Sequence, residues 1–120
     1  MRVLTVEDEG LVLLELAPLI RQAGHGPVMA TNGVEALRPV NIHRPGLVLM
    51  DICLVGPLSD GIEVAKEIRR RHICRLLFVT AIGDTQTRER AAAAHPDAYL
   101  TKPFRPAELR ACMEQLRYAN

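Results

Sequence analysis

The chain contains no tryptophan, and aromatic residues make up only 3% of its 120 residues. Proteins that bind single-stranded nucleic acid stack bases on aromatic side chains, so that class of protein is disfavoured. The cysteines Cys53, Cys74 and Cys112 are odd in number and show no C-x-x-C spacing, which argues against a disulfide framework and against a zinc site. We therefore expect three reduced thiols.

Strong net charge and long apolar runs are also absent. The formal net charge is +1, which gives no field that would gather nucleic acid or anionic lipid. No apolar stretch approaches the roughly 18 residues of a membrane span, and no signal peptide precedes the first predicted strand. With 48% hydrophobic and 24% charged residues, the composition is typical of one compact domain with its own core, and we expect a cytoplasmic location.

Short apolar runs that end at a polar residue occur four times. Each run is typical of a buried strand. The runs and the polar residues that follow them are Val3–Val6 with Asp8, Leu47–Met50 with Asp51, Leu76–Val79 with Thr80, and Ala98–Leu100 with Lys102. In an open parallel sheet with helices on both faces, ligands bind outside the carboxyl ends of the strands. We therefore expect two carboxylates, a hydroxyl and an ammonium to converge on one site.

Strand and helix signals alternate five times, which indicates an α/β fold with a parallel sheet and right-handed crossovers. A further strand is expected near Val28–Ala30, and helices at about Leu11–Ala23, from an Asn32 cap to His43, from an Asp60 cap, from an Asp84 cap to Ala91–Ala94, and from Pro106. Glu35 and Glu63 stand three residues after their caps and predict capping boxes. Pro18 and Pro39 are expected to kink or shorten their helices.

The strongest chemical signal is the acidic run Glu7, Asp8, Glu9 after the first strand, combined with Asp51 after the third. Carboxylates gathered at one sheet edge repel one another unless a cation lies among them. Mg²⁺ suits such a cluster, because it prefers oxygen ligands and keeps part of its water shell. The alternative interpretation is that Glu7 and Glu9 are solvated loop acids.

Asp51 is the better candidate for covalent chemistry, because it follows a buried strand and leads into the glycine-containing loop Gly56–Gly61. A carboxylate can attack a phosphoryl group and hold it as an acyl phosphate, while a metal ion and Lys102 offset the charge of the transferring oxygens. The alternative interpretation of Lys102 is a solvated lysine before a loop proline.

Five segments, in this order and spacing, resemble the receiver domains of two-component response regulators over about residues 2–116. The segments are V-E-D-E, L-V-L-M-D-I, D-G-I-E-V-A, F-V-T-A and L-T-K-P-F. The resemblance implies a three-layer, doubly wound, five-stranded parallel sheet in the flavodoxin-like order 2-1-3-4-5 with five helices. It also implies one receiver domain over residues 1–120, similar in size to the single-domain chemotaxis type.

The resemblance assigns roles to the acidic cluster. Asp51 would accept the phosphoryl group, Asp8 would bind Mg²⁺ directly, and Glu7 would bind it through water. The backbone carbonyl of Cys53 would be a further metal ligand. The phosphoryl group would come from a histidine kinase or a histidine phosphotransfer protein.

The resemblance also implies a switch. Thr80 and Lys102 would each contact a phosphoryl oxygen, and the inward movement would let Tyr99, at the aromatic switch position, turn in. A downstream protein would then bind the fourth helix, last strand and last helix, with no nucleic acid or membrane partner and with a homodimer left open. The Lys102–Pro103 peptide resembles the cis bond of the family. Alternatively, Tyr99 is a plain core residue.

Three functions remain for the sequence to distinguish. The favoured one is a phosphorylatable signalling switch, whose only catalysis is Mg²⁺-dependent self-phosphorylation and slow self-dephosphorylation. A degenerate, unphosphorylated binding module has no need of Asp8, Asp51, Thr80 and Lys102 together. A phosphatase of the haloacid dehalogenase type places its nucleophile on the first strand and has a cap, for which 120 residues leave little room. The domain could be a complete small protein or part of a larger regulator.

Overall fold

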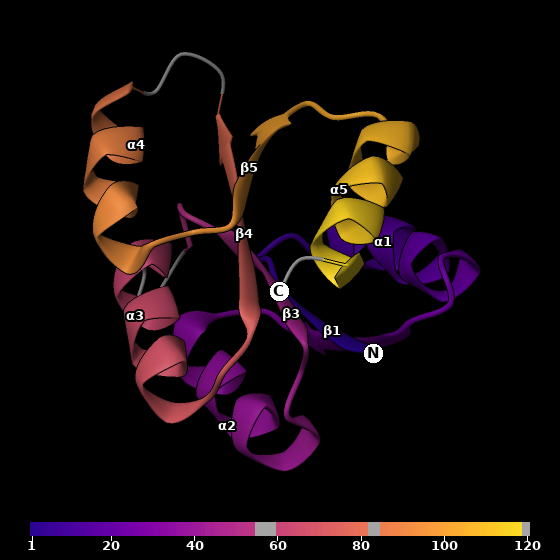
Figure 1. Cartoon of the computed structure of the whole chain (residues 1–120), viewed down its shortest axis with the longest axis horizontal. Coiled ribbons are helices and arrows are strands. Elements are labelled where there is room, and N and C mark those ends of the chain that lie inside the picture. The colour runs from indigo at the N-terminus through magenta and orange to yellow at the C-terminus, as the bar shows by residue number, and fades with distance from the viewer. Residues whose placement is uncertain (55–59, 82–84, 119–120) are drawn as a thin grey trace.

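The computed structural model describes residues 1–54, 60–81 and 85–118. They form a parallel sheet between two helical layers (Figure 1), with the strands in the order β2-β1-β3-β4-β5. The strands are β1 (Arg2–Val6), β2 (Gly26–Ala30), β3 (Leu47–Asp51), β4 (Arg75–Ala81) and β5 (Ala98–Lys102). The helices are α1 (Gly10–Gln22), α2 (Gly33–His43), α3 (Gly61–Arg71), α4 (Thr85–Ala91), the 3-10 turn η1 (Ala92–Ala94) and α5 (Pro106–Tyr118). The predicted fold class and strand order are confirmed.

Helices cover both faces of the sheet, with α1 and α5 on one side and α2, α3 and α4 on the other (Figure 1). All five residues of the central strand β3 are buried. Leu47 and Leu49 pack into the core beneath α1 and α5, whereas Val48 and Met50 pack into the opposite core beneath α2 and α3. This two-sided burial explains why the strand reads as one unbroken apolar run in the sequence.

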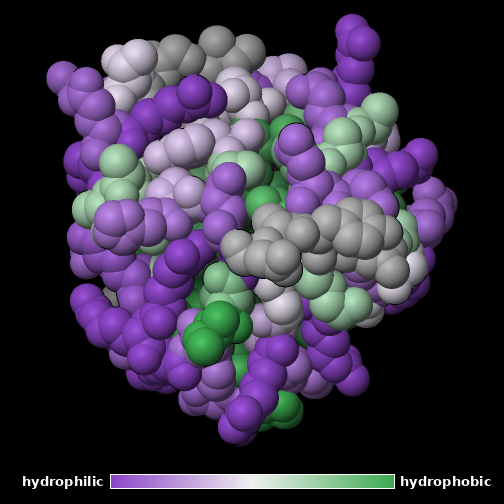
Figure 2. Space-filling view, viewed as in Figure 1, coloured by the Kyte–Doolittle hydropathy of each residue, from purple (hydrophilic) through white to green (hydrophobic). Residues whose placement is uncertain are grey.

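The surface is largely polar on the face that Figure 2 shows, where apolar residues emerge only as small separate patches. The large apolar side chains that lie exposed include Leu11, Leu14, Val34, Ile42 and Ile73. Single exposed apolar residues of this kind are normal for a folded domain.

The predicted capping boxes are only half correct. The Asn32 side chain accepts the Glu35 N–H at 2.8 Å as predicted, but the Glu35 carboxylate accepts from the N–H and hydroxyl of Thr31, not from the Asn32 N–H. At α3 the Asp60 side chain accepts the Ile62 N–H at 3.0 Å. The predicted hydrogen bond from the Asp60 N–H to the Glu63 side chain is not among the contacts of Glu63.

The Glu63 side chain instead pairs with Lys66 at 3.2 Å, because residues three apart on a helix face one another. The Asp84 cap predicted for α4 lies outside the described residues.

Neither internal proline ends its helix. α1 continues through Pro18, and α2 continues through Pro39 to the predicted end at His43, so Pro39 does not shorten its helix, and the expected kinks stay predictions. Pro18 is exposed and Pro39 is half-buried, so water can reach the carbonyls that each proline leaves without a helical donor. The fourth helix ends at Ala91, within the predicted end at Ala91–Ala94, and the next three alanines form η1 before the left-handed residue His95.

The start of α3 lies directly against the chain that follows β3. The Gly61 N–H donates to the Ile52 carbonyl at 2.8 Å. A Cβ atom on Gly61 would lie 2.2 Å from the Asp51 carbonyl oxygen and 2.8 Å from the Ile52 Cα. Only a residue without a side chain allows this approach. Gly61 therefore holds α3 against the backbone of Asp51.

The substitution Gly61→Ala should lower the free energy of unfolding by about 2–3 kcal/mol, because the new methyl group meets rigid backbone. Urea unfolding measures this loss. Gly10→Ala is the matched control, since a Cβ on Gly10 has no atom within 4 Å and its effect should stay within about 0.5 kcal/mol. Equal effects of the two substitutions would show that the close contact at Gly61 is not restrictive.

Candidate functional site

The carboxyl ends of β1, β3, β4 and β5 bring the predicted site residues together. Asp51 ends β3, Lys102 ends β5, and Thr80 lies one residue before the end of β4. Asp8, Asp51, Cys53, Thr80 and Lys102 line a common pocket of about 240 Å³. The parallel register places these ends at one edge, since Val6 pairs with Met50, Asp51 with Val79, and Lys102 with Ala81.

Three carboxylates lie close together at this edge of the sheet. Glu7, Asp8 and Asp51 each offer an oxygen, and these atoms lie within 4.8 Å of one another. Glu7 is only 3% exposed and Asp51 only 7% exposed, while Asp8 is half-buried. Little bulk water is therefore left to screen their mutual repulsion.

Lys102 is the cation that faces these acids. Its Nζ lies 2.8 Å from Glu7 Oε2 and 3.4 Å from Asp51 Oδ2. Partial burial alone would lower the Lys102 pKa, but the hydrogen bond to Glu7 and the charge of Asp51 outweigh it, so the pKa lies above its usual value. Lys102 thus stays charged. It pairs with Glu7 and Asp51, so the alternative interpretation of a solvated lysine is wrong.

The pKa values of Asp8 and Asp51 are both raised by burial. Burial raises the pKa of Asp51 above its usual value, although the Lys102 charge and the Cys53 N–H, which donates to Asp51 Oδ1 at 3.1 Å, oppose the rise. Burial also raises the pKa of Asp8, and the hydrogen bond and negative charge of Glu7 add to the effect. Burial is therefore the main cause of both shifts, and the negative charge of Glu7 adds to it only at Asp8.

A hard divalent cation fits this donor set. Carboxylate oxygens are the ligands that Mg²⁺ prefers, and the three acids stand close enough together to share one ion.

The sequence did not indicate the direct pairing of Glu7 with Lys102, since the two residues are 95 positions apart.

Tyr99 lies beside α4 and is half-buried. Its ring centroid is 6.2 Å from that of Phe78, and its hydroxyl donates to the Arg88 carbonyl at 3.4 Å. The Arg88 guanidinium lies 5.1 Å above the Tyr99 ring and also donates to Thr101 Oγ1 at 2.9 Å. The sequence analysis did not identify Arg88, because no local pattern indicates that a helix side chain covers the Tyr99 ring on a strand. Thr80 is buried within the same strand as Phe78.

Other predictions can be compared with the structure directly. The Lys102–Pro103 peptide is cis, as the resemblance implied. Cys53, Cys74 and Cys112 form no disulfide bond, and Cys53 is exposed at the pocket. Among the described residues, no helix has the length and apolar character needed to cross a membrane.

Comparison with known proteins identifies the family of the chain. The response regulator receiver domain family matches residues 3–114, and the chain belongs to that family. It is therefore a signalling module of the two-component type.

Individual proteins with similar sequences or structures belong to the same class. The chain is 39% identical over 109 residues to the transcriptional regulatory protein PdtaR of Mycobacterium tuberculosis, covering 90% of this chain and 52% of PdtaR. It superposes on the receiver domain of NtrX from Brucella abortus with a TM-score of 0.88 and 27% identity, covering 98% and 99% of the two chains. A putative response regulator from Chloroflexus aurantiacus gives a TM-score of 0.84 and 30% identity, covering 96% and 95%. The chain spans about half the length of the curated relatives it matches.

The crowding of the acids predicts a stabilising substitution. A carboxyl whose pKa is raised on folding costs stability above its folded pKa, and this cost disappears as the pH falls below the unfolded value. In metal-free buffer, Asp8→Asn should therefore raise the free energy of unfolding at pH 7 by about 0.5–1 kcal/mol. The gain should shrink as the pH is lowered toward 4, as followed by thermal unfolding.

The control for this experiment is Glu15→Gln, which removes a negative charge from the exposed face of α1. It should leave stability within about 0.5 kcal/mol of the wild type at either pH. A destabilised Asp8→Asn variant at pH 7 would contradict the repulsion inferred here.

Proposed function

We propose that the chain is one receiver domain over residues 1–120 that accepts a phosphoryl group on Asp51 in a Mg²⁺-dependent reaction. The donor would be a phosphohistidine of a histidine kinase or phosphotransfer protein. The observation that carries the proposal is the pocket in which Asp51 meets Asp8, Thr80 and Lys102. Membership of the receiver family supports it.

The chain's own residues would act by position and charge. An Asp51 carboxylate oxygen would form the bond to phosphorus as the bond from phosphorus to the donor imidazole nitrogen breaks, and the electron pair would leave with that nitrogen. The Cys53 N–H holds one Asp51 oxygen, which fixes the orientation of the carboxylate. Lys102, already 3.4 Å from Asp51 Oδ2, would pair with a phosphoryl oxygen.

Glu7, Asp8, Asp51 and the Cys53 carbonyl would hold the metal. Bound Mg²⁺ would supply positive charge that offsets the acids and the transferring oxygens. Since water can also reach this open site, slow self-dephosphorylation would limit the lifetime of the acyl phosphate. The domain would act in the cytoplasm, a reducing compartment that suits three cysteines without a disulfide bond.

The signal would leave the domain through α4, β5 and α5. The Thr80 hydroxyl would donate to a phosphoryl oxygen, and the movement of β4 would change the space beside Tyr99. Tyr99 is held by Arg88 of α4, so a change of its rotamer would move α4 as well. A downstream protein that binds this face would read the difference. The second candidate, a degenerate receiver, would bind the same partners without phosphorylation.

Incubation with acetyl phosphate and Mg²⁺ should add one phosphoryl group to the wild-type protein, as measured by intact mass. Asp51→Asn should take up none, because the nucleophile is lost, and a chelator should abolish uptake by the wild type. Glu63→Gln, which removes an exposed carboxylate on α3, should react like the wild type. No uptake by the wild type would favour the degenerate receiver.

Phosphorylation should also change amide hydrogen exchange in α4 and β5 while leaving α2 unchanged. Thr80→Ala should still be phosphorylated but should lose most of this change, because the hydroxyl that senses the phosphoryl group is gone. Thr80→Ser keeps a hydroxyl and should retain the response. An unaltered response in Thr80→Ala would contradict the proposed switch.

A further inference from the structure

The helix α4 has little hydrophobic attachment to the domain. Of its seven residues only Ala91 is buried. Two arginines of α4 make polar contacts with other elements, Arg88 with Tyr99 and Thr101 of β5, and Arg90 with Asp60 at the start of α3. Polar contacts therefore contribute much of what holds α4 in place. One of them joins Arg90 to Asp60, whose backbone pairs with Cys53 beside the acidic site.

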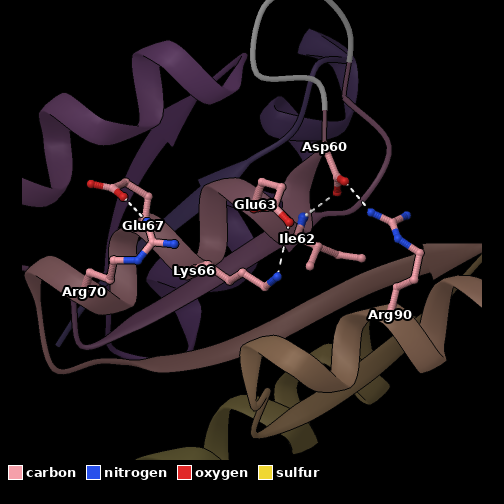
Figure 3. A network of polar contacts seen from close by, with 7 residues as sticks. All are labelled: Asp60, Ile62, Glu63, Lys66, Glu67, Arg70 and Arg90. Atoms are coloured by element: carbon pink, nitrogen blue, oxygen red, sulfur yellow. Dashed lines mark hydrogen bonds and ion pairs between the residues drawn. The ribbon is translucent and has the colours of Figure 1, made fainter.

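Asp60 makes three different contacts. One carboxylate oxygen accepts the Ile62 N–H at 3.0 Å and so caps α3, and the other oxygen pairs with the Arg90 guanidinium (Figure 3). The Asp60 backbone forms an isolated antiparallel bridge with Cys53. Asp60 thus joins the first turn of α3, the side of α4 and the chain that follows Asp51.

Cys53 connects this junction to the acceptor. Its N–H donates to Asp51 Oδ1 at 3.1 Å, and the neighbouring Ile52 carbonyl accepts the Gly61 N–H at 2.8 Å. Two backbone contacts therefore hold residues 52 and 53 against residues 60 and 61. A displacement of Asp60 would be passed to the backbone that orients Asp51.

The other ion pairs drawn in Figure 3 are different in kind. Lys66 pairs with Glu63 and Arg70 pairs with Glu67, so both pairs stay within α3 and reach no second element. They are matched in chemistry to the pair of Arg90 with Asp60, but they do not touch the chain after β3. This difference supplies the control for the inference.

We propose that Asp60 is a positioning residue that, through its ion pair with Arg90, couples the place of α4 to the metal-binding backbone at Cys53. This role deepens the proposed function and rests on it. Because coupling between two sites is reciprocal, Mg²⁺ binding should steady α4, and the tie to α4 should favour Mg²⁺ binding.

The size of the effect follows from the exposure of the pair. The Arg90 and Asp60 side chains are 57% and 35% exposed, so solvent screens their attraction. Exposed ion pairs contribute up to about 1 kcal/mol, which corresponds to a change of about two- to fivefold in a binding constant.

The test is a Mg²⁺ titration in which the thermal midpoint of unfolding reports binding. Arg90→Gln should raise the Mg²⁺ concentration for half-maximal stabilisation about two- to fivefold, whereas Arg70→Gln should leave it unchanged. Asp60→Asn, which keeps an oxygen to cap α3, should have the same effect as Arg90→Gln, and the double variant should show no further change. Arg90→Lys keeps the charge and should restore most of the affinity.

Hydrogen exchange gives a second readout. Mg²⁺ should slow amide exchange in α4 of the wild type and of Arg70→Gln, but not of Arg90→Gln. Equal Mg²⁺ affinities for Arg90→Gln and Arg70→Gln would overturn the coupling, as would additive effects of Asp60→Asn and Arg90→Gln. If Mg²⁺ binds but acetyl phosphate leaves wild-type Asp51 unmodified, the proposed function fails, and the titration still decides the coupling.

Discussion

The excess of negative charge at the carboxyl edge of the sheet is the constraint on which the site depends. Three carboxylates share this edge, and Lys102 is the ammonium that contacts two of them. Glu7 can be almost fully buried because Lys102 pairs with it, which leaves Asp51 the longer and weaker contact. The site therefore carries an excess of negative charge, and a bound divalent ion, as proposed above, would balance it.

The fold creates this imbalance with ordinary packing. Apolar strands buried by helices on both faces bring their ends to one edge, where side chains leave the core and meet solvent. Gly61 then allows α3 to lie against the backbone of Asp51, so this carboxylate lies where β3 meets α3. The geometry of the site is thus a result of how the sheet and α3 pack, and each change in that packing alters the orientation of Asp51.

The sequence predicted the strands, their order through the family resemblance, and the convergence of Asp8, Asp51, Thr80 and Lys102, because apolar runs and the polar residues that end them are local signals. It did not predict contacts between side chains far apart in the chain. The partner of Glu63, for example, depends on which neighbours the folded chain supplies. The ion pair of Asp60 with Arg90 is of the same kind, since 30 positions separate the two residues.

The sparse burial of α4 sets how much work a signal has to do. Moving this helix would expose Ala91, uncover the Tyr99 ring and break the polar contacts of Arg88 and Arg90. An exposed ion pair contributes at most about 1 kcal/mol, whereas a hydrogen bond to a charged group is worth about 1.5–3 kcal/mol. Under the proposed function, a new hydrogen bond at a phosphorylated Asp51 would therefore be comparable in energy to the contacts that hold α4.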